Sequence, residues 1–296
     1  MHIFGIARRS AWAVVGFLVA FGFASPAGAF VASIDVFQVQ QTGGMGATFT
    51  DGFGNDLEPP EGGGIGNVYQ TFGTFPDGSE SGGRLAMDPD NGVLTVNAAG
   101  TPRKTLAAVL ITDTTGNNEL GLYRDEDLTI GGLFDLVPME GPFSTYAVFV
   151  RDFDPGTTRE QVQLQVTRND AGGQTVMRIS FAKQVFVGPG SGITVIDFVD
   201  YAPPMEATRI GLRLQHAADT DSFTASYRYW NDTDPLSDFI FLNGDGMMFN
   251  DRIYVRAGFF ASNQPIPEPR VYALLAAGLL AVTWIARRRR PPLPAA

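Results

Sequence analysis

The chain has 296 residues, which is enough for one large domain or two small ones. It contains no cysteine, and this excludes disulfides, thiolate zinc sites, iron–sulfur clusters and a cysteine nucleophile. The formal net charge of −10 argues against nucleic acid as a partner, because phosphate binding requires a basic surface.

Residues 1–29 predict a secretory signal peptide. Two adjacent arginines form its positive region, and an uncharged apolar segment follows over residues 11–24. The small residues Ala27 and Ala29 frame a cleavage site, so the mature chain is expected to begin at Phe30. The paired arginines resemble a twin-arginine signal, but the rest of that motif is poorly matched, so the general export route is favoured. An uncleaved N-terminal anchor is the alternative.

Residues 30–260 are predicted to form one all-β domain, an antiparallel two-sheet sandwich of the jelly-roll type. The clearest alternation lies in residues 161–167, where Val162, Leu164 and Val166 point one way and three glutamines point the other. Residues 41–66 are Gly-rich and acidic and are expected to form a long loop. The predicted strands, in chain order, are residues 31–40, 68–75, 93–98, 106–112, 144–151, 161–167, 175–187, 193–201, 209–215, 222–230 and 252–259.

The segment 209–230 alternates apolar and polar residues in two runs joined by a short loop. This pattern loosely resembles the paired strands of concanavalin-like and laminin-G-like domains. The resemblance covers about 20 residues of the chain, and it implies a β-sandwich without implying a ligand.

His216 is the one histidine outside the signal peptide, so a Ser-His-Asp triad would have to use it, with Asp219 or Asp221 as the orienting acid. No Gly-x-Ser-x-Gly elbow is present to supply the nucleophile. The favoured interpretation is a surface or loop histidine without a catalytic role.

Glycoside hydrolysis requires two carboxylates across a cleft. The Glu-x-Asp-x-x-Glu strand of the concanavalin-like hydrolases is absent. The nearest acidic run is Asp125, Glu126 and Asp127, and it is expected to lie in an exposed loop, because adjacent strand residues would face opposite sides. No catalytic residue is therefore predicted.

Calcium is a candidate ligand, because hard cations bind several loop oxygens. Asp232 and Asp234 in one loop and Asp88 and Asp90 in another offer such groups, as does the loop 51–56. The alternative is that these residues only form turns.

Trp230, at the end of a predicted strand, is a candidate for stacking on a sugar ring. The flat apolar face of an indole ring suits such a contact. The alternative is that Trp230 closes the rim of the sandwich core.

The C-terminal region 270–296 predicts a membrane helix, because residues 271–286 carry no charge. The helix is followed by four adjacent arginines that are expected to stay on the cytoplasmic side: Arg287, Arg288, Arg289 and Arg290. The preceding spacer, residues 261–269, ends in Pro267, Glu268 and Pro269. Together the motif, the helix and the basic cluster resemble the PEP-CTERM sorting signal. A plain single-pass anchor is the alternative.

The resemblance implies a Gram-negative bacterium that makes exopolysaccharide, and an exosortase that cuts the chain at the motif. The inner membrane would then be a transient anchor, and the cell surface or extracellular matrix the destination. The expected function is a non-enzymatic structural or binding role; the alternatives are a lectin-like carbohydrate-binding module and, after it, a glycan-active enzyme. Residues 30–269 hold 14 basic and 31 acidic residues, a net charge near −17. Binding of an anionic polysaccharide is therefore expected to need a bridging cation.

Overall fold

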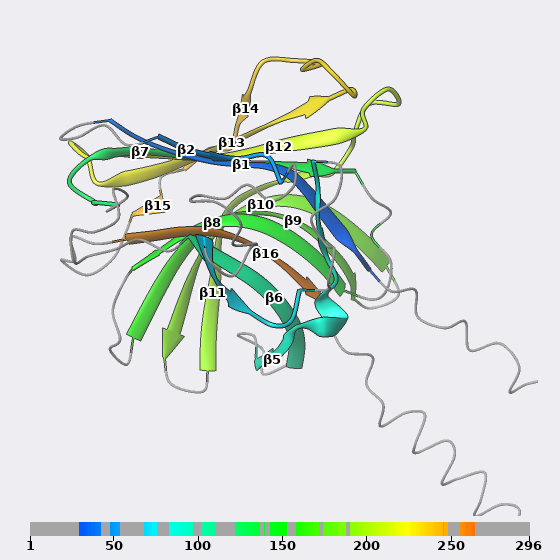
Figure 1. Cartoon of the computed structure of the whole chain (residues 1–296), viewed down its shortest axis with the longest axis horizontal. Helices are drawn as coiled ribbons and strands as arrows, with labels where there is room; N and C mark the ends of the chain where they lie inside the picture. Colours follow the sequence, from blue (N-terminus) through cyan, green and yellow to red (C-terminus); the bar gives the residue numbers. More distant parts are fainter. Residues whose placement is uncertain are drawn as a thin grey trace, which may run out of the picture.

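The computed structural model describes residues 30–42, 48–53, 68–75, 83–96, 102–110, 122–136, 139, 143–152, 158–171, 174–187, 190–244, 246–247 and 255–263. These residues form an all-β fold of two antiparallel sheets packed face to face, as the alternation predicted. Figure 1 shows sheet A as a flat layer and sheet B as an arched layer beside it.

Sheet A contains eight strands, and its central strands are long enough to cover the core. Their order is β14 (Ile240–Phe241), β13 (Ser222–Trp230), β12 (Arg209–Ala217), β7 (Asp127–Asp135), β1 (Ala32–Thr42) and β2 (Thr48–Asp51). Two short strands pair outside this path: β15 (Gly246–Met247) on β13 and β4 (Leu85–Met87) on β1. A short 3-10 helix, Pro89–Asn91, follows β4.

Sheet B also contains eight strands. Their order is β11 (Gly190–Asp200), β10 (Gln174–Val187), β9 (Thr158–Ala171), β8 (Phe143–Asp152), β16 (Val255–Asn263), β6 (Pro102–Leu110) and β3 (Tyr69–Phe72). Strand β5 (Val93–Val96) pairs with β6 beside β3. The last of the described strands, β16, thus lies inside sheet B, and it continues three residues into the predicted spacer.

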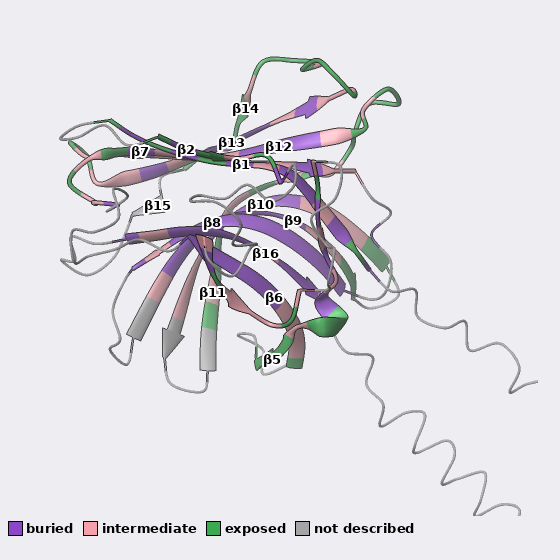
Figure 2. Ribbon diagram, in the orientation of Figure 1, coloured by how far each residue is buried: buried purple, intermediate pink, exposed green. Residues whose placement is uncertain are grey.

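The core lies between the two sheets and is built from the apolar faces of most of the strands (Figure 2). An aromatic cluster fills its centre, where the Phe259 ring lies 5.2 Å from Phe37 and 5.4 Å from Tyr69, between centroids. Val162, Leu164 and Val166 are fully buried here, so the predicted direction of the β9 alternation is confirmed. Period-2 patterning predicted these residues because one face of each strand is buried against the other sheet.

Two parts of sheet A contradict the predicted loops. Residues 41–66 were expected to form a long loop, but β1 extends to Thr42 and β2 pairs with it at Thr48–Asp51. Strand β7 was not predicted at all, although it lies in the middle of sheet A between β1 and β12. Its Gly131 and Gly132 resemble a turn in sequence, whereas in the fold they lie inside the strand. A side chain at Gly132 would come within 2.7 Å of Val148 in the facing sheet.

A buried ion network joins three strands of sheet A. A register shift between Ile34 and Val36 marks a β-bulge at Asp35, whose side chain is only 6% exposed. Arg209 Nε lies 2.9 Å from Asp35 and 3.7 Å from Asp135, while Arg84 approaches both carboxylates from the surface. Burial, and for Asp35 also repulsion from Asp135, raises the pKa of both carboxyls, while the arginines lower it.

Gly258 makes room for a ring on the outer face of sheet B. A Cβ at this position would lie 2.4 Å from the Ala108 carbonyl oxygen and 2.7 Å from the Phe149 ring. We therefore expect Gly258→Ala to lower the free energy of unfolding by about 1–3 kcal/mol, because neither the backbone nor the ring can move freely. Urea unfolding of the purified chain checks this.

The matched control is Gly192→Ala in β11, where an added Cβ meets no atom within 4 Å. Its free energy of unfolding should change by less than about 1 kcal/mol. Equal effects of the two substitutions would contradict the close approach at Gly258.

Candidate functional site: a cleft on the outer face of sheet B

A cleft of about 180 Å³ lies on the face of sheet B that points away from sheet A. Its walls come from both edges of the sheet, since Thr95 of β5 and Phe72 of β3 line it together with Ile193 of β11. Strands at opposite edges can border one cleft only because the sheet is strongly curved (Figure 1). The volume is below the roughly 300–1,000 Å³ of sites for drug-sized ligands, so it suits a small group or a single ring.

Small residues in the middle of the sheet leave space for the rings that border the cleft. Cross-strand pairing places Ala107, Phe260, Ala147 and Gln165 in one row across β6, β16, β8 and β9. The next row contains Gly258 and the Phe149 ring, which lies 5.9 Å from Phe260 between centroids. These rings give the cleft apolar walls, while its polar groups come from β9 and the edges.

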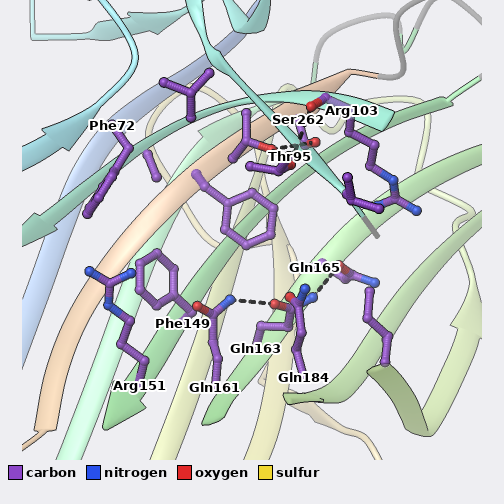
Figure 3. A pocket seen from close by; sticks show the side chains of 16 residues that line it. Phe72, Thr95, Arg103, Phe149, Arg151, Gln161, Gln163, Gln165, Gln184 and Ser262 are labelled. Atoms are coloured by element: carbon purple, nitrogen blue, oxygen red, sulfur yellow. Dashed lines mark hydrogen bonds between the residues drawn. The ribbon is translucent and has the colours of Figure 1, made fainter. Parts of the chain in front are cut away.

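Three glutamines of β9 form a hydrogen-bonded ladder in the cleft (Figure 3). Gln161 Nε2 donates to Gln163 Oε1 at 2.6 Å, and Gln163 Nε2 donates to Gln165 Oε1 at 2.8 Å. All three side chains are buried, so the polar face of this strand is not a solvent face. Gln184 of β10 pairs across from Gln161 and also lines the cleft. Amide groups offer both donors and acceptors, which suits a ligand rich in hydroxyls.

The cleft is cationic although the chain as a whole is acidic. Two arginines and no aspartate or glutamate are among the described residues that line it. The Arg151 guanidinium carbon lies 5.1 Å from the Phe72 centroid and 5.8 Å from the Phe149 centroid. The Arg103 guanidinium carbon lies 3.5 Å from the Phe143 centroid. Burial lowers the pKa of Arg103 to about 10, so this arginine stays protonated at neutral pH.

The cleft could not be predicted from the alternation of apolar and polar residues. That pattern places the glutamines on the polar side of a strand and indicates no role for Arg103 or Arg151. One signal was present, since residues 161–165 place uncharged amides rather than charges at every second position. Exposed strand faces are commonly charged, and a run of amides is better suited to a partly covered face.

His216 is buried, not a surface or loop residue, so that prediction was wrong. Its Nε2 lies 3.1 Å from Asp221 Oδ1 and its Nδ1 lies 3.2 Å from the Glu126 carbonyl oxygen. Hydrogen bonds from Arg124, and then from His216, hold the pKa of Asp221 below its usual range. Among the described residues no serine hydroxyl is shown in contact with this histidine. The hydrogen bonds of His216 with Asp221 and Glu126 connect the β12–β13 turn to the segment before β7.

Asp125 and Glu126 of the acidic run lie in the turn before β7, and Asp127 is the first residue of that strand. Asp125 and Asp127 are exposed and Glu126 is half-buried. Asp127 Oδ1 accepts a 2.8 Å hydrogen bond from the Ala218 amide, so it braces the neighbouring turn. None of the three lines the cleft.

The candidate calcium residues form turns in the described structure. Asp88 accepts hydrogen bonds from the Asp90 amide and the Asn91 side chain at the start of the 3-10 helix. Asp234 accepts a bond from Thr233, next to exposed Asp232. Within the described ranges, no group of three or more His, Asp or Glu side chains comes together to hold a metal ion. Calcium binding by these loops stays a prediction.

Trp230 lies on the outer face of sheet A, on the opposite sheet from the cleft. The Arg228 guanidinium carbon is 4.4 Å from its ring centroid, and Nε1 would lie 3.1 Å from a Cβ placed at Gly211. The indole is half-buried and does not belong to the core between the sheets. A sugar ring stacking here would have to share the indole with Arg228, and such stacking stays a prediction.

The predicted signal peptide with Ala27 and Ala29 lies outside the described residues. So do Pro267, Glu268, Pro269, the helix 271–286 and the arginines 287–290. In the part of the chain that is described, no helix is long and apolar enough to cross a membrane.

Comparison with known proteins assigns no family. No family model matches the chain, and no curated protein matches it.

Proposed function

We propose that this chain is an exported jelly-roll domain that binds carbohydrate in the cleft of sheet B and is sorted to the cell surface or extracellular matrix. The observation that carries the proposal is the buried glutamine ladder facing aromatic rings across a small cleft. Sugars present hydroxyls at their edges and C–H groups on their faces. The amides can form hydrogen bonds with the hydroxyls, and the rings of Phe149 and Phe260 can pack against the C–H groups.

The composition of the cleft supports binding rather than glycoside hydrolysis. Hydrolysis needs a pair of carboxylates across the scissile bond. The described residues that line the cleft include neither aspartate nor glutamate. The described lining of the cleft therefore offers no carboxylate pair that could act as the acid and base of a glycan-active enzyme.

The sorting part of the proposal rests on the sequence of the tail. Pro267, Glu268 and Pro269, the uncharged segment 271–286 and the arginines 287–290 follow one another in the order of a PEP-CTERM signal. An exosortase is the partner this signal implies, with the inner membrane as a transient anchor. A surface or matrix location would bring the cleft next to exopolysaccharide.

Substitution within the ladder tests carbohydrate binding. Gln163→Ala removes the central amide, which accepts one hydrogen bond and donates another. We expect a roughly tenfold rise in Kd for a bound oligosaccharide, because the variant loses the hydrogen bond between this amide and a sugar hydroxyl. Such a bond contributes about 0.5–1.5 kcal/mol. Glycan-array screening of the full chain identifies the oligosaccharide, and titration calorimetry measures the affinity.

Two variants serve as controls. Gln38→Ala removes an exposed glutamine from the outer face of sheet A and should leave Kd within twofold. Trp230→Ala should also leave Kd unchanged if the cleft is the site. Loss of binding in Trp230→Ala but not in Gln163→Ala would move the site to sheet A and refute the proposal. Thermal unfolding of each variant shows whether the fold is retained.

A further inference from the structure

Arg103 is a half-buried cation at one end of the cleft, and its Nε atom is buried. Its guanidinium lies on the Phe143 ring, and within the described structure its Nε has no hydrogen-bond partner. None of the ion pairs among the described residues involves it, whereas Arg84, Arg124, Arg168 and Arg209 each pair with an aspartate. A partly desolvated cation that has no counter-ion in the described part of the chain gains free energy when an anion reaches it.

The hydrogen bonds of the glutamine ladder all run in one direction, toward the end of the cleft where Arg103 lies. Each amide N–H₂ donates toward the next residue, from Gln161 to Gln163 to Gln165. The bonds of the ladder therefore leave an N–H₂ group over at Gln165 and a carbonyl oxygen over at Gln161. Figure 3 shows Arg103 and Gln165 at the same end of the cleft, with Arg151 at the other. Donor hydrogens and a positive charge thus meet at the Arg103 end.

The charge of the whole exported region is opposite to that of the cleft. Residues 30–269 have a net charge near −17, which repels anionic polymers at long range. Among the described residues that line the cleft there is no acid that could neutralise Arg103. Short-range contact with a desolvated arginine is little screened by salt, unlike the repulsion between exposed charges. A single anionic group can therefore be held here without the bridging cation expected from the net charge.

We infer that the cleft selects a sugar residue carrying an anionic oxygen group, the carboxylate of a uronic acid or a sulfate ester, and that Arg103 with the Gln165 amide holds this group. The inference rests on the proposed carbohydrate binding at the same cleft. A guanidinium donates two parallel N–H bonds to such a group, and the amide adds a third donor. The ladder and the aromatic walls hold the rest of the ring.

Three oligosaccharides of equal length test this selectivity on the full chain: a polyuronate, a sulfated glycan and a neutral glucan. We expect wild type to bind at least one of the two anionic probes about tenfold or more tightly than the neutral probe, in calcium-free buffer with chelator. Comparison of the first two probes shows which anion is preferred. Equal affinity for all three would overturn the inference while leaving carbohydrate binding intact. Absence of binding to any probe would refute the proposed function itself.

Charge-changing variants locate the selectivity. Arg103→Gln should weaken binding of the preferred anionic probe about tenfold and that of the neutral probe less than twofold, and Arg103→Lys should recover part of the loss. Gln165→Glu places a negative charge at the same end and should also weaken only anionic binding. The matched control is Arg213→Gln, because the Arg213 guanidinium carbon also lies 3.5 Å from a ring centroid, that of Phe239 on sheet A. An equal loss in Arg213→Gln, or none in Arg103→Gln and Gln165→Glu, would overturn the assignment.

Discussion

Replacing Arg209 with alanine is expected to lower the free energy of unfolding by about 3–5 kcal/mol, because it leaves two largely buried carboxylates with only the half-exposed Arg84 as a counter-ion. Arg209 Nε lies 2.9 Å from Asp35 and 3.7 Å from Asp135, and the Asp35 side chain is 6% exposed. Urea unfolding of the full chain near neutral pH measures the loss.

The loss should depend on pH. Burial raises the pKa of Asp35 and Asp135 in the folded protein above the ordinary aspartate value. A carboxyl with a raised folded pKa binds more protons when folded, so its contribution to stability falls as pH rises through that pKa. Removal of Arg209 raises both pKa values further. The penalty of Arg209→Ala should therefore be smaller at about pH 4 than at pH 7.5.

Arg84→Ala is the matched control. Arg84 contacts the same two carboxylates, but its side chain is 48% exposed, so water can replace it. Its loss should cost about 1 kcal/mol or less. Equal penalties for the two variants, or a penalty for Arg209→Ala that does not vary with pH, would contradict the network described here.

Replacing Glu268 with alanine is expected to stop removal of the C-terminal tail, and uncut chain should accumulate in the inner membrane. Export and insertion of the segment 271–286 should be unaffected, because neither depends on that carboxylate. The measurement is the size and membrane fraction of the wild type and of the variant in a host that carries an exosortase.

Glu206→Ala removes an exposed carboxylate far from the motif and should be processed like the wild type. A plain single-pass anchor predicts that Glu268→Ala also behaves like the wild type. Identical processing of all three chains would therefore replace the sorting proposal with a simple membrane anchor.

Local alternation predicted most strands of the sandwich because a face that packs against another sheet must be apolar at every second residue. The pattern in residues 209–215 and 222–230 predicted β12 and β13, and Ile210, Leu212 and Leu214 are indeed buried. It failed at β7, where Gly131 and Gly132 interrupt the apolar series. Only the neighbouring β1 and β12 show that this segment is a strand.

Contacts between distant residues could not be predicted in the same way. Arg209 and Asp35 lie 174 positions apart in the sequence, and Asp35 lies at a β-bulge in β1. Arg103 of β6 contacts Phe143 of β8, and these two strands lie on either side of β16 in sheet B. Neither the strand order nor the bulge has a local signal in the chain.

The sequence by itself determined the all-β class and the apolar face of most strands, because the period of two is a local property of the chain. It also carries the predicted signals at both ends. Only the tertiary structure decided what covers the polar faces of the strands. The glutamines of β9 are on the polar side in either case, but the curvature of sheet B brings its edge strands around them and makes a cleft. Curvature depends on the twist and pairing of eight strands together, so no single segment encodes it.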